Sequence, residues 1–184
     1  MIEIIKKQNQ MIRRLKEENR RLAHYAARDD MTCLFNRRVG MIWLNKEINQ
    51  TRHHGNPITI CFIDLDNLKQ INDEFGHIQG DLFIQTFSRL LTKQIRKEDQ
   101  AFRMGGDEFL IVFPHTTKEE VTHMIQRIQQ EVDKINQEKQ FPFTMSFSYG
   151  LCEHKRGSGE TAAELIDKAD KMMYGRKLKK KGSQ

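Results

Sequence analysis

Two adjacent glycines, Gly105 and Gly106, separate two short apolar runs and constrain the fold of this chain more than any other feature. Glycine adopts positive φ at little steric cost, so a Gly-Gly pair between strand-like runs predicts a tight β-hairpin turn. Asp107 and Glu108 follow directly. Because neighbouring strand residues point to opposite faces, at least one of these acids must face solvent or a ligand. The hairpin tip is therefore either an ordinary polar turn or a site for a divalent metal.

The length of 184 residues and the hydrophobic share of 38% predict one globular domain with an appendage. The longest nearly apolar run, Ile58 to Ile63, is far too short to cross a bilayer. Glu3, Lys6 and Lys7 interrupt the N-terminus, where a signal peptide needs an unbroken apolar stretch. We therefore expect a cytoplasmic protein with no membrane span.

Cysteine content and charge exclude several other classes of protein. The chain has 3 cysteines without a Cys-x-x-Cys pair, so neither a disulfide framework nor a zinc site is expected. The net charge of +6 is concentrated in the N-terminal segment and the C-terminal tail. No row of interleaved aromatic residues accompanies it, so we expect solvated or phosphate-facing charges and no nucleic-acid partner.

Residues 1–28 contain no Gly or Pro and are rich in helix-forming residues, which predicts a helix. In a heptad register, one core position holds Ile5, Ile12, Asn19 and Ala26, and the other holds Gln8, Leu15 and Leu22. This seam favours a short coiled coil, in which a single Asn fixes register and two-strandedness. The alternative is an amphipathic helix lying on its own domain. We expect a signalling coiled-coil helix over 1–28, a homodimer, and one domain over 29–184.

The rest of the chain alternates helical and strand-like patterns. We expect helices over 37–53, 68–72, 82–95, 118–138 and 162–177, a loop through Gly76 and Gly80, and strands over 58–63, 101–103, 110–113 and 143–151. The run 58–63 is apolar on both faces, as in a central buried strand. The fold class is therefore α/β in layers (α+β), with a central mixed sheet flanked by helices and partly antiparallel because of the hairpin.

A carboxylate, Asp64, follows the expected buried strand. One interpretation is that Asp64 caps the next helical turn. If the strand pairs beside the hairpin, Asp64 instead meets Asp107 or Glu108 at one edge of the sheet. Clustered carboxylates repel one another unless a cation lies between them, and oxygen ligands favour Mg²⁺ or Mn²⁺ over zinc.

Six motifs in this order resemble the GGDEF family of diguanylate cyclases over roughly residues 29–178. The motifs are DMTCLFNRR (30–38), DLDNLKQIND (64–73), FGH (75–77) with GD (80–81), RMGGDEF (103–109), SYG (148–150), and AD (169–170) with Tyr174 and Lys177. The resemblance implies a GGDEF fold, similar to adenylyl cyclase and polymerase palm domains. It also implies the conversion of two GTP into cyclic di-GMP and two pyrophosphates.

The resemblance assigns metal binding to the side chains of Asp64 and Asp107 and to the carbonyl of Leu65. Glu108 would bind metal or assist deprotonation of the 3′-hydroxyl, and the sequence leaves both roles open. Two Mg²⁺ ions held by three acids would supply the charge neutralisation that phosphoryl transfer requires.

The resemblance also assigns substrate contacts. Asn72 and Asp81 match guanine contacts, and a carboxylate suits the N1–H and N2–H₂ donors of guanine and repels N1 of adenine. Alternatively, Asn72 caps a turn and Asp81 caps the following helix. Lys69 and Lys177 match phosphate-binding positions, and Arg103 matches a contact with a neighbouring nucleotide.

Arg96 and Asp99 match the Arg-x-x-Asp inhibitory site of the family, where the product would bind. A solvated ion pair at a helix end is the alternative. The chain departs from the family pattern at three places, which puts the packing of the phosphate loop and the tail geometry in question. The departures are Asn67-Leu68, Cys33 and Lys180-Lys181.

The sequence thus predicts a diguanylate cyclase that works as a homodimer, because a ring with two equivalent phosphodiester bonds requires two facing domains. A non-catalytic receptor for GTP or cyclic di-GMP and a cyclase making a mixed guanine–adenine dinucleotide are the rivals. We expect an upstream sensor domain or a separate partner to set the activity.

Overall fold

The computed structural model describes the backbone of residues 2–181 and the side chains of residues 7–18, 26–51 and 55–180. The helices are α1 (Ile2–Tyr25), α2 (Arg37–His54), α3 (Leu68–Phe75), α4 (His77–Gln94), α5 (Lys118–Gln137) and α6 (Ala162–Lys181). The strands are β1 (Phe35–Asn36), β2 (Ile58–Leu65), β3 (Gln100–Gly105), β4 (Glu108–Pro114) and β5 (Phe147–His154). Among the described residues, no helix is long and apolar enough to cross a membrane.

The five described strands form one mixed sheet in the order β1-β3-β4-β2-β5, which confirms the expected fold class. β1 and β3 run parallel, and each other neighbouring pair runs antiparallel. The β3–β4 hairpin turns through Gly105 and Gly106, whose φ angles of 152° and 45° suit glycine. β4 and β2 lie next to each other, so the hairpin is joined directly to the strand that carries Asp64.

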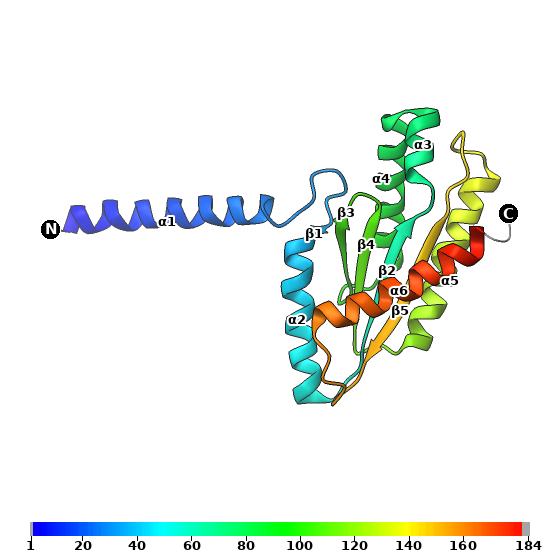
Figure 1. Ribbon diagram of the computed structural model, residues 1–184. Helices are drawn as coiled ribbons and strands as arrows, with labels where there is room; N and C mark the ends of the chain where they lie inside the picture. The colour runs from blue at the N-terminus through cyan, green and yellow to red at the C-terminus, as the bar shows by residue number, and fades with distance from the viewer. Residues whose placement is uncertain (1, 182–184) are drawn as a thin grey trace.

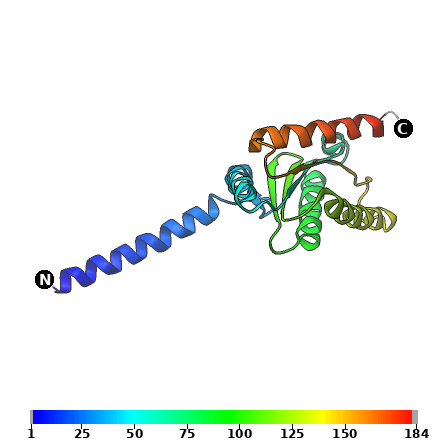
Figure 2. The same cartoon turned by 90° about the horizontal axis from the view of Figure 1, so that it is seen from below.

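Alternate residues of β2 face two separate cores. Cys61, Ile63 and Leu65 pack in the core that contains residues of α3, α4 and α5. Ile60 and Phe62 pack in the core that contains residues of α2 and α6. Figure 2 shows the same layering, with α6 on one side of the sheet and α4 and α5 on the other. β2 is therefore buried on both faces, as its apolar sequence predicts.

α4 begins earlier than its apolar pattern predicts. The helix starts at His77 and not at residue 82, because Gly76, at φ 86°, already turns the chain between α3 and α4. Gly80 and Asp81 therefore lie within the helix and not in a loop before it. The alternative role of Asp81 as the cap of this helix is consequently wrong.

Other boundaries differ by a few residues. β2 continues to Leu65 because β4 and β5 pair with its last residues, so Asp64 lies within the strand. β5 begins at Phe147, four residues later than predicted, since the chain bends at 141–143. α6 continues to Lys181. β1 is a two-residue strand that the sequence pattern does not predict.

α1 projects away from the globular part as one straight helix (Figure 1) and does not lie along its own domain. Ile12 and Leu15, two positions of the predicted seam, are 48% and 58% exposed. The seam positions Ile5, Asn19 and Leu22 lie outside the residues whose side chains are described. The coiled coil, the homodimer and the domain boundary at residue 28 stay predictions.

Candidate functional site

The register of β2 and β4 brings the predicted metal-binding residues to one edge of the sheet. Asp64 of β2 lies opposite Glu108, the first residue of β4. The backbone N–H of Leu65 donates to the carbonyl of Asp107 over 3.0 Å. Asp107 lies in the hairpin turn itself. Acids that are 43 and 44 positions from Asp64 in the sequence thus join it at one acidic edge, because the two central strands pair with this register.

Asp64 is almost fully buried, with 8% of the residue exposed. Nζ of Lys177, on α6, lies 2.5 Å from Oδ1 of Asp64. Burial raises the pKa of Asp64, the hydrogen bond from Lys177 opposes this, and the charge of Asp107 raises the pKa further. Burial likewise raises the pKa of Glu108, with further increases from neighbouring carboxylates that include Asp107 and Asp170. The acids at this edge repel one another, and Lys177 balances part of their charge.

The acidic edge has the chemistry of a divalent cation site. Within the residues that the structure describes, no three His, Cys, Asp or Glu side chains gather closely enough to hold a metal ion as they stand. Burial lowers the pKa of Lys177, but its hydrogen bond with Asp64 raises the pKa on balance, so its ammonium remains charged there. The atoms of the acids that could coordinate a metal are all oxygens, which suit Mg²⁺ or Mn²⁺. Burial is the main cause of the raised pKa of Asp64 and of Glu108, and repulsion by neighbouring carboxylates adds to it. A bound cation would relieve that repulsion, so the chemistry of these residues fits a metal.

A cavity of about 550 Å³ opens beside the hairpin turn. Known small-molecule sites measure about 300–1,000 Å³. The cavity is lined by the start of α3, by Asp107 and by Lys177, and Lys69 is among the α3 residues. The structure thus gathers one predicted metal ligand and both predicted phosphate-binding lysines around a single space.

The two predicted guanine contacts lie close together on neighbouring helices. Asn72 is on α3 and half-buried, and Asp81 is on α4 and exposed. Asn72 lies against Gly80, the residue before Asp81. Asp73, next to Asn72, lines the cavity. Asn72 and Asp81 themselves are not among the residues that line the cavity, so their contact with guanine stays a prediction.

Arg103 binds groups of its own chain. Its Nη1 lies 3.0 Å and 3.2 Å from the two carboxylate oxygens of Asp29. Its Nε and Nη2 donate to the carbonyl of Gly106 over 3.2 Å and 2.9 Å. Sequence reasoning assigns no role to Asp29, although this residue links the segment after α1 to the hairpin turn. The contact between Arg103 and a neighbouring nucleotide stays a prediction.

Arg96 and Asp99 line a second cavity, of about 280 Å³, together with Arg28 and Phe35. Asp99 is 5% exposed, and its Oδ2 accepts from the backbone N–H of Arg96 over 2.8 Å. Its Oδ1 is buried without a hydrogen-bond partner in the described part of the chain. Burial raises the pKa of Asp99. Asp99 is thus no solvated surface charge, and binding of the product here stays a prediction.

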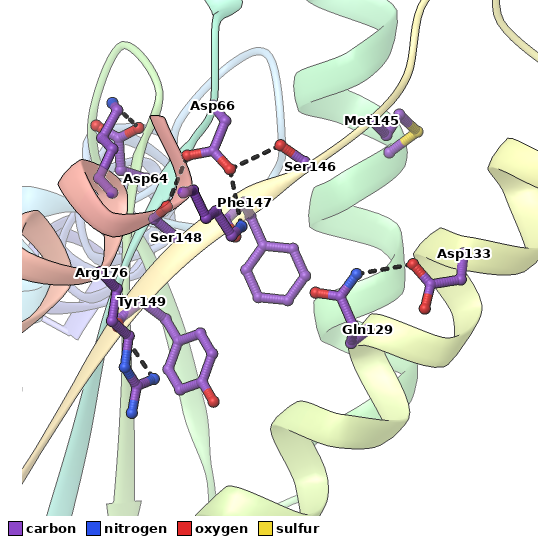
Figure 3. Close-up of polar contacts among 12 residues, drawn as sticks. Asp64, Asp66, Gln129, Asp133, Met145, Ser146, Phe147, Ser148, Tyr149 and Arg176 are labelled. Carbon is purple, nitrogen blue, oxygen red and sulfur yellow. Dashed lines mark hydrogen bonds and ion pairs between the residues drawn. The ribbon is translucent and has the colours of Figure 1, made fainter. Parts of the chain in front are cut away.

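Asp66 is a polar centre that sequence reasoning missed. Its two carboxylate oxygens accept from the hydroxyls of Ser146 and Ser148, each over 2.7 Å (Figure 3). Nζ of Lys180, on α6, lies 3.0 Å from Oδ2. Burial raises the pKa of Asp66, but these hydrogen bonds lower it on balance. The lysine that departs from the family pattern therefore ties the end of α6 to the end of β2.

Solved structures with the same architecture define the class of this domain. The coiled coil and GGDEF domain of DgcB from Caulobacter crescentus, solved with c-di-GMP, has a TM-score of 0.84 at 23% identity, covering 95% of this chain and 92% of that chain. The diguanylate cyclase SiaD from Pseudomonas aeruginosa, solved with its activator SiaC, has a TM-score of 0.77 at 25% identity, covering 96% of this chain and 68% of that chain. The fold is that of GGDEF domains.

The sequence comparison gives the same family. The family described as "Diguanylate cyclase, GGDEF domain" matches residues 26–183. The probable diguanylate cyclase DgcJ of Escherichia coli is 32% identical over 152 residues, which are 83% of this chain and 29% of that protein. DgcP of the same organism is 41% identical over 123 residues, 66% of this chain and 36% of that protein. The chain belongs to the GGDEF family of diguanylate cyclases, and it spans only about a third of these relatives.

Proposed function

We propose that this chain is a diguanylate cyclase that condenses two GTP into cyclic di-GMP and releases two pyrophosphates. One observation carries the proposal: the β2–β4 register puts Asp64 beside Glu108, next to a cavity lined by two lysines. Phosphoryl transfer depends mainly on positioning and on neutralisation of charge. Acids for a metal and lysines for phosphates are the groups that such a reaction requires.

The acidic edge would carry the chemistry. The side chains of Asp64, Asp107 and Glu108 and the carbonyl of Leu65 would hold Mg²⁺ or Mn²⁺. When bound, the metal supplies positive charge to the attacking and leaving oxygens. Glu108 either serves as a ligand or accepts the proton of the 3′-hydroxyl as this oxygen attacks the α-phosphate.

The remaining residues would bind and orient GTP. Lys69 and Lys177 would contact the phosphates, and Lys177 would exchange its partner Asp64 for a phosphate oxygen. Asn72 and Asp81 would contact guanine, so GTP should be preferred over ATP. Arg103 would contact the nucleotide of the facing domain from its place at the hairpin turn.

Assembly and control are part of the same proposal. The symmetric product requires a homodimer in which two domains face each other. Arg96 and Asp99 would bind cyclic di-GMP as an inhibitor, which the cavity beside them supports. A sensor domain or a separate partner would set the activity, and a cytoplasmic location would supply GTP. The DgcB structure, solved with c-di-GMP, supports binding of the product, and the SiaD structure, solved with an activator, supports control by a partner.

The test is incubation of the purified protein with GTP and Mg²⁺ at several protein concentrations, with products identified by mass spectrometry. We expect cyclic di-GMP to rise more than linearly with protein concentration. Asp107→Ala and Glu108→Ala should each abolish the product. Absence of product from a folded wild-type protein that still binds GTP would contradict the proposal and favour a non-catalytic receptor. Competition between GTP and ATP would reveal a mixed dinucleotide.

A further inference from the structure

Gly80 lies inside helix α4, where its backbone conformation gives no reason for glycine. A glycine inside a helix costs up to about 1 kcal/mol relative to alanine. Gly76, before the helix, has a positive φ of 86°, but Gly80 is not among the glycines with positive φ. Gly80 is buried. Glycine must therefore be required here because the space around position 80 has no room for a side chain.

Asn72 occupies that space. A Cβ added to Gly80 would lie 1.9 Å from Oδ1 and 2.9 Å from Cγ of Asn72. It would also lie 3.3 Å from Cδ1 of Leu68. The first distance is far inside van der Waals contact, so even a methyl group at position 80 would displace the amide of Asn72. The present position of the Asn72 side chain thus depends on glycine at position 80.

The two ends of the Asn72 amide have different surroundings. Oδ1 is buried and has no hydrogen-bond partner in the part of the chain that the structure describes. The Cα–H bond of Gly80 points at Oδ1, in the direction that a Cβ would take. Such a C–H···O contact suits an oxygen and not an N–H₂ group. Nδ2 is not among the buried unpartnered atoms of the described residues, so the donor end of the amide is either accessible to solvent or hydrogen-bonded.

We propose that Gly80 is a positioning residue for base selection, which turns Asn72 so that its amide N–H₂ donates to O6 of guanine. The inference rests on the proposed function, in which Asn72 and Asp81 contact guanine. Asp81 follows Gly80 and would accept from N1–H and N2–H₂, and O6 is the next group on the same edge of the base. Adenine carries an amino group at that place, which the N–H₂ of Asn72 repels.

The test measures binding of 3′-deoxy-GTP and 3′-deoxy-ATP, which lack the attacking hydroxyl, to the full chain with Mg²⁺ by calorimetry. We expect Gly80→Ala to weaken 3′-deoxy-GTP binding about tenfold and not to weaken 3′-deoxy-ATP binding. A tenfold loss corresponds to about 1.4 kcal/mol. The matched control is Gly175→Ala in α6, where an added Cβ meets nothing within 4 Å. Both variants exchange a helical glycine for alanine, and the control should bind like the wild type.

A second variant tests the amide orientation without changing Gly80. Asn72→Asp keeps an oxygen against Gly80 and replaces the outward N–H₂ by an oxygen that repels O6, so 3′-deoxy-GTP binding should fall at least tenfold. In an Asn72→Ala background, Gly80→Ala should cause no further loss. Melting temperatures establish that each variant is folded.

Two results would overturn this inference alone: wild-type affinity of Asn72→Asp for 3′-deoxy-GTP, or a loss by Gly80→Ala that persists in the Asn72→Ala background. Failure of the wild-type protein itself to bind 3′-deoxy-GTP would overturn the proposed function, and this inference with it.

Discussion

Two lysines on α6 each pair with one buried acid at the end of β2. Lys177 pairs with Asp64 and Lys180 with Asp66, across 113 and 114 positions of sequence. A buried carboxylate without a partner would destabilise the fold, so each lysine has a structural role, and Lys177 also lines the cavity. In the proposed reaction only Lys177 changes partner, because Asp66 retains the hydroxyls of Ser146 and Ser148.

Arg96 provides a test of product inhibition. Arg96→Ala should leave initial rates of cyclic di-GMP formation unchanged and should raise the product concentration that halves the rate by at least tenfold. The reason is that a guanidinium fork suits O6 and N7 of guanine. Arg89→Ala, which removes an exposed arginine of the same helix region, is the control. Equal inhibition of both variants would contradict the inhibitory site.

Asp29 provides a test of pH dependence. Burial raises the pKa of this residue, but hydrogen bonds from Thr32 and Arg103 lower it on balance below 3.8. Its contribution to stability is therefore complete above the unfolded pKa and disappears as the pH falls through the lower folded pKa. We expect Asp29→Asn to reduce the free energy of unfolding by about 1 kcal/mol at pH 7, measured by urea denaturation.

Below about pH 4 the difference between wild type and Asp29→Asn should shrink, because the carboxylate is then protonated in the unfolded chain, and it should vanish once the pH falls below the lower folded pKa. Asp30→Asn, at the exposed neighbouring position, is the control and should match the wild type at every pH. A difference that stays constant between pH 3 and pH 7 would contradict this account of the ion pair.

At the scale of elements, the position of α6 depends on its close packing against β5. The two elements approach closely at Gly150 of β5, where an added Cβ would lie 1.8 Å from the carbonyl oxygen of Ala169 and 2.7 Å from the backbone nitrogen of Met173. Both atoms belong to the helix backbone and cannot rotate away. Gly150 thus sets the distance between helix and sheet at which Lys177 reaches Asp64.

Gly150→Ala should therefore separate α6 from β5. We expect a loss of about 2–3 kcal/mol in the free energy of unfolding, as for other overpacked sites, and a clear loss of cyclase activity even below the melting temperature. Gly175→Ala in α6, with open space around the added methyl group, should be neutral or slightly stabilising. Thermal unfolding and activity of both variants decide the point, and wild-type behaviour of Gly150→Ala would contradict it.

At the scale of the whole molecule, the chain consists of a layered domain and a helix that projects from it (Figure 1). The apolar residues of α1 that the structure describes, Met11, Ile12 and Leu15, are each about half exposed, at 58%, 48% and 58%. A helix of this kind gains stability by pairing with a second copy, which is also what the proposed reaction requires. The link from α1 to the hairpin turn runs through Asp29 and Arg103.

Ile12→Asn combined with Leu15→Asn should weaken the dimer. We expect the protein concentration for half-maximal specific activity to rise about tenfold, with nearly full activity restored at high concentration. The reason is that each helix loses two apolar side chains that the coiled coil would bury. Gln10→Ala, at an exposed position of the same helix, is the control. Sedimentation velocity measures the dimer directly, and an unchanged monomer–dimer equilibrium would contradict the coiled-coil prediction.

The sequence anticipated most elements of the fold but misplaced several boundaries. The apolar run of β2 and the glycine pair of the hairpin are local patterns, and both elements form where expected. The start of α4 was not predictable from the apolar pattern. The first turn of the helix does not follow this pattern, because its apolar residue Ile78 is exposed. The pairing of Asp66 with Lys180 also escaped prediction, because no local pattern relates residues so far apart.

The sequence by itself determined the order of the elements, the glycine turn that presents Asp107 and Glu108, and membership of the family. These depend on backbone conformation and on the period of apolar residues, which are local properties. Only the tertiary structure decided that Asp64 lies opposite Glu108 and that Lys177 reaches Asp64. Strand register and helix position result from the packing of two cores on one sheet, and no single segment of the sequence contains that information.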